Sequence, residues 1–230
     1  MTRDTTLGCA GCAVPKFQRA CDGDHGTGPG GCPTLTAGEA LAAAEAAYDQ
    51  PAILDFARQA SRQEAAGYTD SGGGPRASLT RIEEICQFAR RMGFQKLGLA
   101  FCAGLIDEAA ALDRILTARG FEVSSVVCKV GRVPKERLGL ADEDKIRPGE
   151  FEPMCNPIAQ AELLNRAGTE LNLVLGLCVG HDALFIRHAE AYTTVVAVKD
   201  RVLGHNPLAA LYTSGSYYWF LGQPGLVDET

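Results

Sequence analysis

The sequence predicts an α/β fold: a mostly parallel, Rossmann-like sheet with helices on both faces, preceded by a small Cys-rich segment that binds metal. From Gly93 onward, four short apolar runs alternate with helical or loop segments, which is the pattern of a parallel sheet covered on both faces. At 230 residues, the chain is long for one domain and short for two full ones. Its first 38 residues are rich in Gly, Cys and Pro and hold too few apolar side chains to form a core.

Each expected element follows from its own pattern. Ala, Glu and Leu dominate residues 36–62, which predicts helices with a break near Pro51, and a further helix follows the Gly-rich loop at 71–75. The expected strands are 96–101, 121–127, 171–177 and 193–198, and the expected helices between them include 105–119 and 157–167. We therefore expect three segments: a metal-binding segment at 1–38, a helical segment packed on the core at 39–92, and the α/β domain at 93–230.

Composition excludes several classes of protein. No apolar run approaches the roughly 20 residues that cross a bilayer, so we expect no membrane span. A formal net charge of −6 without a Lys/Arg block argues against a nucleic-acid partner. Residues 1–6 lack the basic and then apolar pattern of a signal peptide, which indicates the cytoplasm. In a reducing cytosol, nine cysteines are better explained by metal binding or catalysis than by disulfides.

Four cysteines lie near the N-terminus, in the pattern Cys9-x2-Cys12-x8-Cys21-x10-Cys32. Four soft thiolate ligands suit an iron–sulfur cluster or a zinc ion equally well in number. The proline after Cys32 is typical of cluster motifs and favours a 4Fe–4S cluster, whereas the irregular spacing weakens the zinc interpretation. The alternatives are structural zinc, or free or disulfide-paired cysteines in a loose tail. His25 could replace one thiol, although a single loop histidine is more often solvated.

Three of the expected strands end at a cysteine: Cys102, Cys128 and Cys178. In open parallel sheets that edge binds ligands, because loops and helix N-termini diverge there. Cysteine is also a common small core residue, which is the competing interpretation for each one alone. Cys155 lies just before the helix expected at 157–167. Cys102 stands at the start of a helix, where the dipole would lower the pKa of its thiol, so it is the first candidate for a nucleophile or ligand.

Polar residues accompany these thiols at the same edge. The expected catalytic set is Cys102, Cys178, His181 and Asp182. In it His181 would act as acid or base, and Asp182 would orient it or a neighbour. Buried charges need partners, so such a cluster is costly unless it binds a ligand or performs chemistry. The expected cofactor-binding set is Cys128, Lys129, Cys155, Asn156, Lys199, Asp200, Arg201 and His205.

Four motifs carry a resemblance to a known family. At residues 101–105 (FCAGL), 154–160 (MCNPIAQ), 176–182 (GLCVGHD) and 198–207 (VKDRVLGHNP), the chain resembles a family of uncharacterised proteins described as predicted metal-binding, a domain of unknown function. The resemblance covers nearly the whole chain. That family is found largely in anaerobic bacteria and archaea, which implies an oxygen-sensitive cluster. The resemblance thus implies a metal and no particular reaction.

The leading hypothesis is an enzyme or electron carrier with an N-terminal iron–sulfur cluster. Its strand-end thiols would bind a small molecule, a second cluster or a sulfur-containing substrate, for redox or sulfur-transfer chemistry. The alternative is a non-catalytic metal- or ligand-binding or sensing module with a structural zinc site. A third hypothesis is metal storage or delivery, in which the strand-end thiols are a transfer site. A redox partner protein and a homodimer are compatible with the leading hypothesis.

Overall fold

The computed structural model describes residues 7–225 of the chain. The chain divides into two compact units, residues 1–64 and residues 65–230. The division into three segments that the sequence suggests, with boundaries after residues 38 and 92, stays a prediction. Among the described residues, no helix has both the length and the apolar composition needed to cross a membrane.

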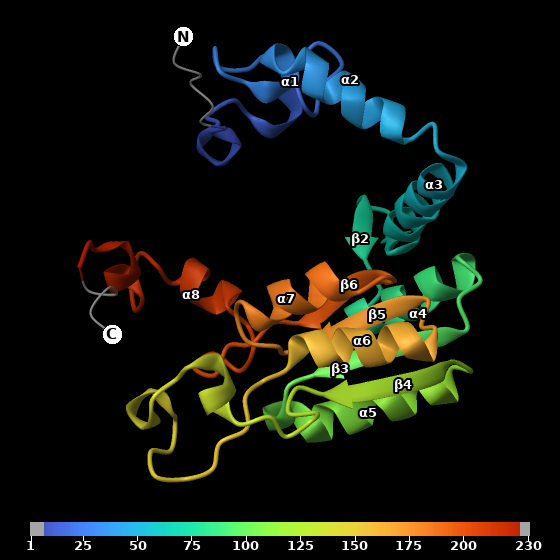
Figure 1. Ribbon diagram of the computed structural model, residues 1–230. Coiled ribbons are helices and arrows are strands. Elements are labelled where there is room, and N and C mark those ends of the chain that lie inside the picture. Colours follow the sequence, from blue (N-terminus) through green and yellow to red (C-terminus); the bar gives the residue numbers. More distant parts are fainter. Residues whose placement is uncertain (1–6, 226–230) are drawn as a thin grey trace. The chain divides into compact units, whose positions relative to one another are not determined.

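The first unit consists of short helical turns followed by helices (Figure 1). The elements are η1 (Cys9–Gly11), η2 (Lys16–Gln18), α1 (Pro33–Thr36), α2 (Gly38–Ala47) and α3 (Pro51–Ala66), the last of which extends past the boundary of the unit. The helices expected in this stretch are confirmed, and Pro51 is the first residue of α3. A proline suits that position because its fixed φ is helical and its missing N–H has no intrahelical partner there.

A short hairpin that follows α3 in the chain was not predicted from the sequence. In it, β1 (Tyr68–Asp70) pairs antiparallel with β2 (Pro75–Ala77). Asp70 Oδ1 accepts a hydrogen bond from the Gly72 amide at 2.8 Å, which shapes the connecting turn. Both strands are exposed and only 3 residues long, so they show no alternation of apolar and polar residues.

The second unit carries a four-stranded sheet in which every neighbouring pair is parallel. Its strands lie in the order β4 (Glu122–Val127), β3 (Lys96–Phe101), β5 (Leu171–Leu175) and β6 (Tyr192–Ala197). The predicted α/β fold with a parallel, Rossmann-like sheet is therefore confirmed. The first expected strand coincides with β3, while β5 ends two residues earlier than expected because the chain turns at Gly176.

Helices cover both faces of this sheet (Figure 1). The core of one face holds α4 (Arg81–Arg91) and α5 (Ile106–Ala118), and the core of the other holds α6 (Pro157–Ala167) and α7 (His181–His188). Successive residues of β3 point to opposite faces: Leu99 belongs to the first core and Ala100 to the second. Burial on both sides explains why this strand reads as one apolar run.

The start of α6 is set by its sequence. The Asn156 side chain accepts a hydrogen bond from the Ala159 amide at 3.1 Å, and Pro157 occupies the first helical position. The start of α4 is likewise fixed by a capping box between Thr80 and Glu83. Because α6 starts directly after Cys155, its cap also fixes where that thiol lies.

The remaining elements are short. They are η3 (Ala103–Leu105), η4 (Lys135–Leu138), η5 (Asp142–Asp144), α8 (Leu208–Tyr212) and η6 (Trp219–Gly222). Near the C-terminal end, Tyr212 and Tyr217 are 77% and 84% exposed. The expected homodimer stays a prediction.

Candidate functional site

The strand order places a topological switch point between β3 and β5. From β3 the chain moves to β4 on one side, and it later returns to β5 on the other side, so the loops after β3 and β5 diverge. Cys102 directly follows β3, and its amide donates to Leu175 O at the end of β5, at 3.2 Å. Cys178 lies shortly after β5, and Lys199 shortly after β6. These three predicted site residues therefore stand at the ligand-binding edge of the sheet.

Hydrogen-bond donors surround the Cys102 sulfur. The Cys128 thiol, the Gly104 amide and the Lys199 ammonium group all act on it. An added Cβ at Gly104 would lie 3.6 Å from Lys199 Nζ and 3.9 Å from Cys102 Sγ, so both groups lie on the same side of that residue. The Cys128 thiol, followed by Gly104 and Lys199, lowers the pKa of Cys102 to about 4 although burial opposes the shift. These groups therefore favour the thiolate form of Cys102.

Cys128 keeps its proton and joins two other sulfurs. It is only 2% exposed, its Sγ accepts a hydrogen bond from the Ala103 amide at 3.3 Å, and it lies 3.8 Å from Cys155 Sγ. Its hydrogen bonds to Cys102 and Cys155, together with burial, raise the pKa of Cys128 above the ordinary thiol range. A protonated Cys128 thiol has a single proton, so it can stabilise only one neighbouring thiolate at a time.

Cys155 reaches Cys128 because the long loop between β4 and α6 is closed at its base, which we call the neck. Three backbone hydrogen bonds form the neck: Asn156 N to Cys128 O at 2.7 Å, Met154 N to Val133 O at 2.7 Å, and Lys135 N to Glu152 O at 3.1 Å. The neck brings together two cysteines that are 27 positions apart in the sequence.

Cys155 is the second acidic thiol of the network. Its hydrogen bond with Cys128 lowers the pKa of Cys155 to about 6, helped by the charges of Lys129 and His181 and opposed by burial. The Lys129 ammonium group also donates to Pro153 O in the neck. His181 Nδ1 is buried, and no described residue offers it a hydrogen-bond partner. The charges of Lys129 and His181, two of the predicted site residues, thus both act on the Cys155 thiol.

Cys178 stands outside this network and has a cation of its own. Arg201 Nη2 donates to Cys178 Sγ at 3.1 Å. Asp182 follows in the sequence, but its Oδ1 accepts from the Ala183 amide at 2.8 Å, which is a local helix-start bond. The role that the sequence suggested for Asp182, orienting His181, stays a prediction.

Asp200 and His205 build the turn that follows β6. The Asp200 amide donates to His205 Nδ1 at 3.1 Å, and the His205 amide donates back to Asp200 O at 2.8 Å. Asp200 Oδ1 also accepts from the amides of Val202 and Leu203. His205 has a φ of 66°, a left-handed conformation that these bonds hold in place. The two side chains therefore shape the turn that carries Arg201.

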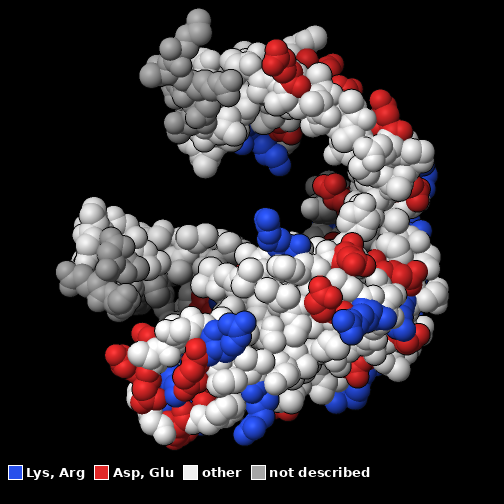
Figure 2. All heavy atoms as spheres, viewed as in Figure 1, with Lys and Arg blue, Asp and Glu red and all other residues white. Residues whose placement is uncertain are grey.

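Ion pairs hold the tip of the loop beyond the neck. Lys145 Nζ lies 2.6 Å from Glu136 and 2.9 Å from Asp142, and Lys135 Nζ lies 2.7 Å from Glu152. Figure 2 shows acidic and basic side chains intermixed on this loop. Glu152 is only 4% exposed, and its carboxylate also accepts from the Ile146 and Arg147 amides. These contacts order the loop and, through Lys135 and Glu152, the neck.

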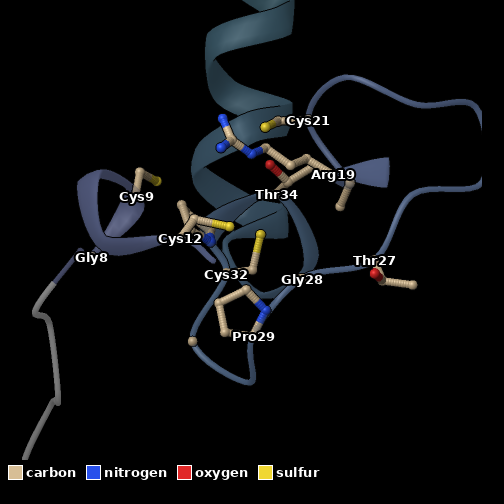
Figure 3. A pocket seen from close by; sticks show the side chains of 13 residues that line it. Gly8, Cys9, Cys12, Arg19, Cys21, Thr27, Gly28, Pro29, Cys32 and Thr34 are labelled. Carbon is tan, nitrogen blue, oxygen red and sulfur yellow. The ribbon is translucent and has the colours of Figure 1, made fainter. Parts of the chain in front are cut away.

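The N-terminal cysteines share a cavity. Cys9, Cys12, Cys21 and Cys32 all line a space of about 330 Å³, and their sulfurs point into it in Figure 3. Arg19 also lines this space, and its Nε donates to Val14 O at 2.8 Å. Sequence reasoning missed Arg19, because a single basic residue between cysteines carries no signal of its own.

The donor types in this cavity fit a metal centre, but the sulfur positions do not show one. Four thiols beside a guanidinium group suit an anionic metal–thiolate centre in their chemistry. Within residues 7–225, however, no three His, Cys, Asp or Glu side chains gather closely enough to bind one metal ion. The metal at this site therefore stays a prediction, as does a second cluster at the strand-end thiols.

Gln160 is a site-building residue that sequence reasoning missed. It is fully buried, and its Nε2 donates to Phe101 O at 3.2 Å and Val126 O at 2.7 Å. These carbonyls lie at the ends of β3 and β4, next to Cys102 and Cys128. The available signal was its register: Gln160 shares the inward face of α6 with Leu164 and other buried residues.

Comparison with known proteins gives the family. The family described as "Protein of unknown function (DUF1847)" matches residues 32–196, which is more than half of the chain. The chain belongs to this family. It is also 51% identical over 139 residues to "Uncharacterized protein MJ0455" of Methanocaldococcus jannaschii, which covers 60% of this chain and 69% of that protein.

The expected membership of a family of unknown function is thus confirmed. The matched range includes Cys32 and all the strand-end thiols but leaves out the first three N-terminal cysteines and the residues after β6. Neither description names a metal, a ligand or an activity, so a functional proposal rests on the chemistry of the site.

Proposed function

We propose that this chain is an enzyme of thiol chemistry in which Cys102 is the nucleophile of a redox or sulfur-transfer reaction. The observation that carries the proposal is the polar surrounding of Cys102. A Cβ added at Gly104 would lie 3.6 Å from Lys199 Nζ and 3.9 Å from Cys102 Sγ, and the Cys128 thiol and the Gly104 amide also act on this sulfur. A thiolate, and not a thiol, is the nucleophile in such reactions. A cysteine kept only for core packing needs none of these donors.

The position of Cys102 supports the same role. It is half-buried at the C-terminal edge of the sheet, beside the switch point where open α/β sheets bind ligands. Cys86, in contrast, is 1% exposed in the core, and burial raises the pKa of Cys86. The chain therefore offers an internal comparison: Cys102 lies beside polar groups at the edge of the sheet, and Cys86 is buried among apolar side chains.

Alkylation as a function of pH tests this proposal. Brief pulses of iodoacetamide, followed by mass spectrometry of peptides, would give a rate for each cysteine in the folded protein. We expect the Cys102 rate to be level near neutral pH and to fall only as the pH drops through about 4, while Cys86 stays unlabelled. A Cys102 rate that rises only near pH ~8.5, the ordinary thiol value, would remove the basis of the proposal.

For the N-terminal cavity we propose a 4Fe–4S cluster held by Cys9, Cys12, Cys21 and Cys32. A space of about 330 Å³ has room for roughly ten water molecules, which suits a cluster of several atoms better than a single ion. A cluster with four thiolates is anionic, and the Arg19 guanidinium group on the cavity wall would stabilise that charge. The cluster would supply electron transfer, for which we propose a redox partner protein.

Anaerobic purification with iron, zinc and acid-labile sulfide analysis tests the cluster. About four irons and matching sulfide per chain, with visible absorption that bleaches on reduction, are expected. A colourless protein with about one zinc would favour the alternative, a non-catalytic binding or sensing module with a structural zinc site. Free thiols in either site require a reducing compartment, and we propose the cytoplasm.

A further inference from the structure

We propose that the substrate at Cys102 is a small anionic donor of sulfane sulfur, such as thiosulfate or a low-molecular-weight persulfide, and that Cys102 carries the transferred sulfur as a persulfide. This inference rests on the proposed function and narrows it to sulfur transfer. It follows from three features of the site: the partners of Cys102, the kind of leaving group they permit, and the charge around the thiols.

The first feature is what lies beside the Cys102 sulfur. The described partners of this sulfur are a thiol, an amide and an ammonium group, with no imidazole or carboxylate among them. The imidazole of His181 acts on Cys155. The groups that act on the Cys102 sulfur therefore stabilise negative charge on it, and none of them is a general base.

The second feature is the leaving group that such a site permits. Amine and alkoxide leaving groups need a proton from a general acid, which acyl-transfer enzymes supply with a histidine beside the nucleophile. Sulfite and thiolates leave as stable anions, and thiolates of low pKa leave fastest. The partners of Cys102 therefore suit cleavage of a sulfur–sulfur bond better than cleavage of an ester or amide.

The transfer balances without an added oxidant or proton. The Cys102 thiolate attacks the outer sulfur of thiosulfate, a bond forms between these two sulfurs, and the sulfur–sulfur bond of thiosulfate breaks. Sulfite leaves with the electron pair of the broken bond, and Cys102 carries a persulfide anion. The Cys102 sulfur is formally oxidised and the sulfonate sulfur formally reduced, so no electrons enter or leave the reaction.

The third feature is positive charge at the edge of the sheet. A Cβ added at Gly104 would lie 3.6 Å from Lys199 Nζ and 3.9 Å from Cys102 Sγ, so the ammonium group and the sulfur lie beside the same space. The charge of Lys129 acts on Cys155. An anionic donor would be drawn to Lys199, and the terminal sulfur of the persulfide could take over its ammonium contact. The Cys128 thiol and the Gly104 amide remain available to the inner sulfur. Substrate and product thus meet donors that are already in place.

Sulfur loading tests the inference directly. The reduced protein would be incubated without oxygen with thiosulfate in one sample and glutathione persulfide in another, and its peptides analysed by mass spectrometry. We expect one added sulfur atom on the Cys102 peptide from at least one donor, none in Cys102→Ser, and unchanged loading in Cys86→Ser. Loading from thiosulfate would identify a sulfur oxyanion as the donor, and loading from the persulfide alone an organic one.

Two other outcomes would overturn the inference. If neither donor loads Cys102 while iodoacetamide still labels it at acidic pH, the thiol chemistry stands and the sulfane-sulfur substrate is wrong. A Cys102 that neither loads nor reacts at acidic pH would remove the proposed function as well.

Discussion

The Cys32 side chain occupies space that is free only because Gly28 has no side chain. A Cβ added at Gly28 would lie 2.7 Å from Cys32 Cβ and 2.8 Å from Cys32 Sγ, well inside nonbonded contact. Nothing lies within 4 Å of the corresponding position at Gly30 in the same loop. One glycine thus sets the position of a cavity thiol, and its neighbour offers a control.

For this reason we predict that Gly28→Ala weakens metal binding at the N-terminal cavity. The added methyl group must push the Cys32 side chain aside, which should lower metal affinity by roughly ten-fold or more. Metal and sulfide content after purification, and again after a chelator challenge, measures the effect. Gly30→Ala should retain the metal of the unmodified chain, and equal loss in both variants would contradict a specific role of Gly28.

Removing the Cys128 thiol should raise the pKa of Cys102 more than any other single change at the site. Cys128 is the largest of the causes that lower it. In Cys128→Ala, the pH at which Cys102 alkylation reaches half its maximum should therefore move up from about 4 toward the ordinary thiol range. Cys86→Ala removes a similarly buried cysteine from the core and should leave the Cys102 profile where it is. The same shift in both would mean that loosened packing, and not the hydrogen bond, is responsible.

Lys199→Met should produce a smaller shift in the same direction. The variant keeps an unbranched side chain but removes the hydrogen bond and the positive charge at the Cys102 sulfur. In this variant, the lowering of the Cys102 pKa that persists should also depend less on salt concentration, because a charge interaction has been removed. Lys96→Met, which breaks only an ion pair with Glu122 at the opposite end of β3, is the matched control. No displacement of the profile in Lys199→Met would show that the ammonium group does not act on Cys102.

Gln160→Leu should destabilise the second unit. The substitution removes two hydrogen bonds to buried strand-end carbonyls, which costs about 1–3 kcal/mol of unfolding free energy. Urea unfolding followed by circular dichroism measures this loss. Glu162→Ala, on the exposed side of the same helix, should change the free energy of unfolding by about 0.5 kcal/mol or less. If Gln160→Leu is as stable as the unmodified chain, the carbonyls do not depend on this amide.

Glu152→Gln should loosen the neck and expose Cys155. The uncharged amide loses the ion pair with Lys135 and accepts more weakly from the Ile146 and Arg147 amides. A bulky maleimide should then label Cys155 several-fold faster at neutral pH, while Cys86 stays unlabelled as the internal control for global unfolding. Glu150→Gln, which breaks only an exposed contact with Arg147, should leave the labelling rate unchanged.

Acid should reproduce this loosening in the unmodified chain. Lys135 and the two backbone amides lower the pKa of Glu152, so its stabilising contribution is complete above the carboxyl's ordinary value and is lost as the pH falls through the lowered one. The rate of Cys155 labelling in the unmodified chain, divided by the rate in Glu152→Gln, should therefore rise toward one at the acidic end of the profile, because the titration of Cys155 itself cancels in this ratio. A ratio that stays constant in acid would contradict a role of the ionised carboxylate in closing the neck.

Sequence reasoning located the strands and the strand-end thiols because both leave local signals. The apolar runs that became β3 and β4 are bounded by turn residues, and a cysteine directly follows each of them. Once the sheet was expected to be parallel, the positions of Cys102 and Cys128 at one edge followed from geometry. These are features that a short window of sequence can carry.

Contacts between distant segments left no such signal. The approach of Cys155 to Cys128 depends on backbone bonds in the neck, and backbone bonding has no residue preference to detect. The two bonds from Gln160 depend on which face of α6 turns inward at the ends of β3 and β4. The spacing of Arg19 among the N-terminal cysteines was likewise uninformative until the loop was seen to fold around them.

The strand order also makes the acidic thiol a reporter of folding. Three different strands precede the groups at this site: Cys102 follows β3, Cys128 follows β4 and Lys199 follows β6. The site is therefore complete only when β6 has joined the sheet. An intermediate that lacks β6 has no ammonium group beside Cys102, and one that lacks β4 has no thiol donor. During refolding, rapid alkylation of Cys102 in mild acid would thus appear only when these crossovers are complete. The chain carries a chemical signal of its own native state, readable without an added dye.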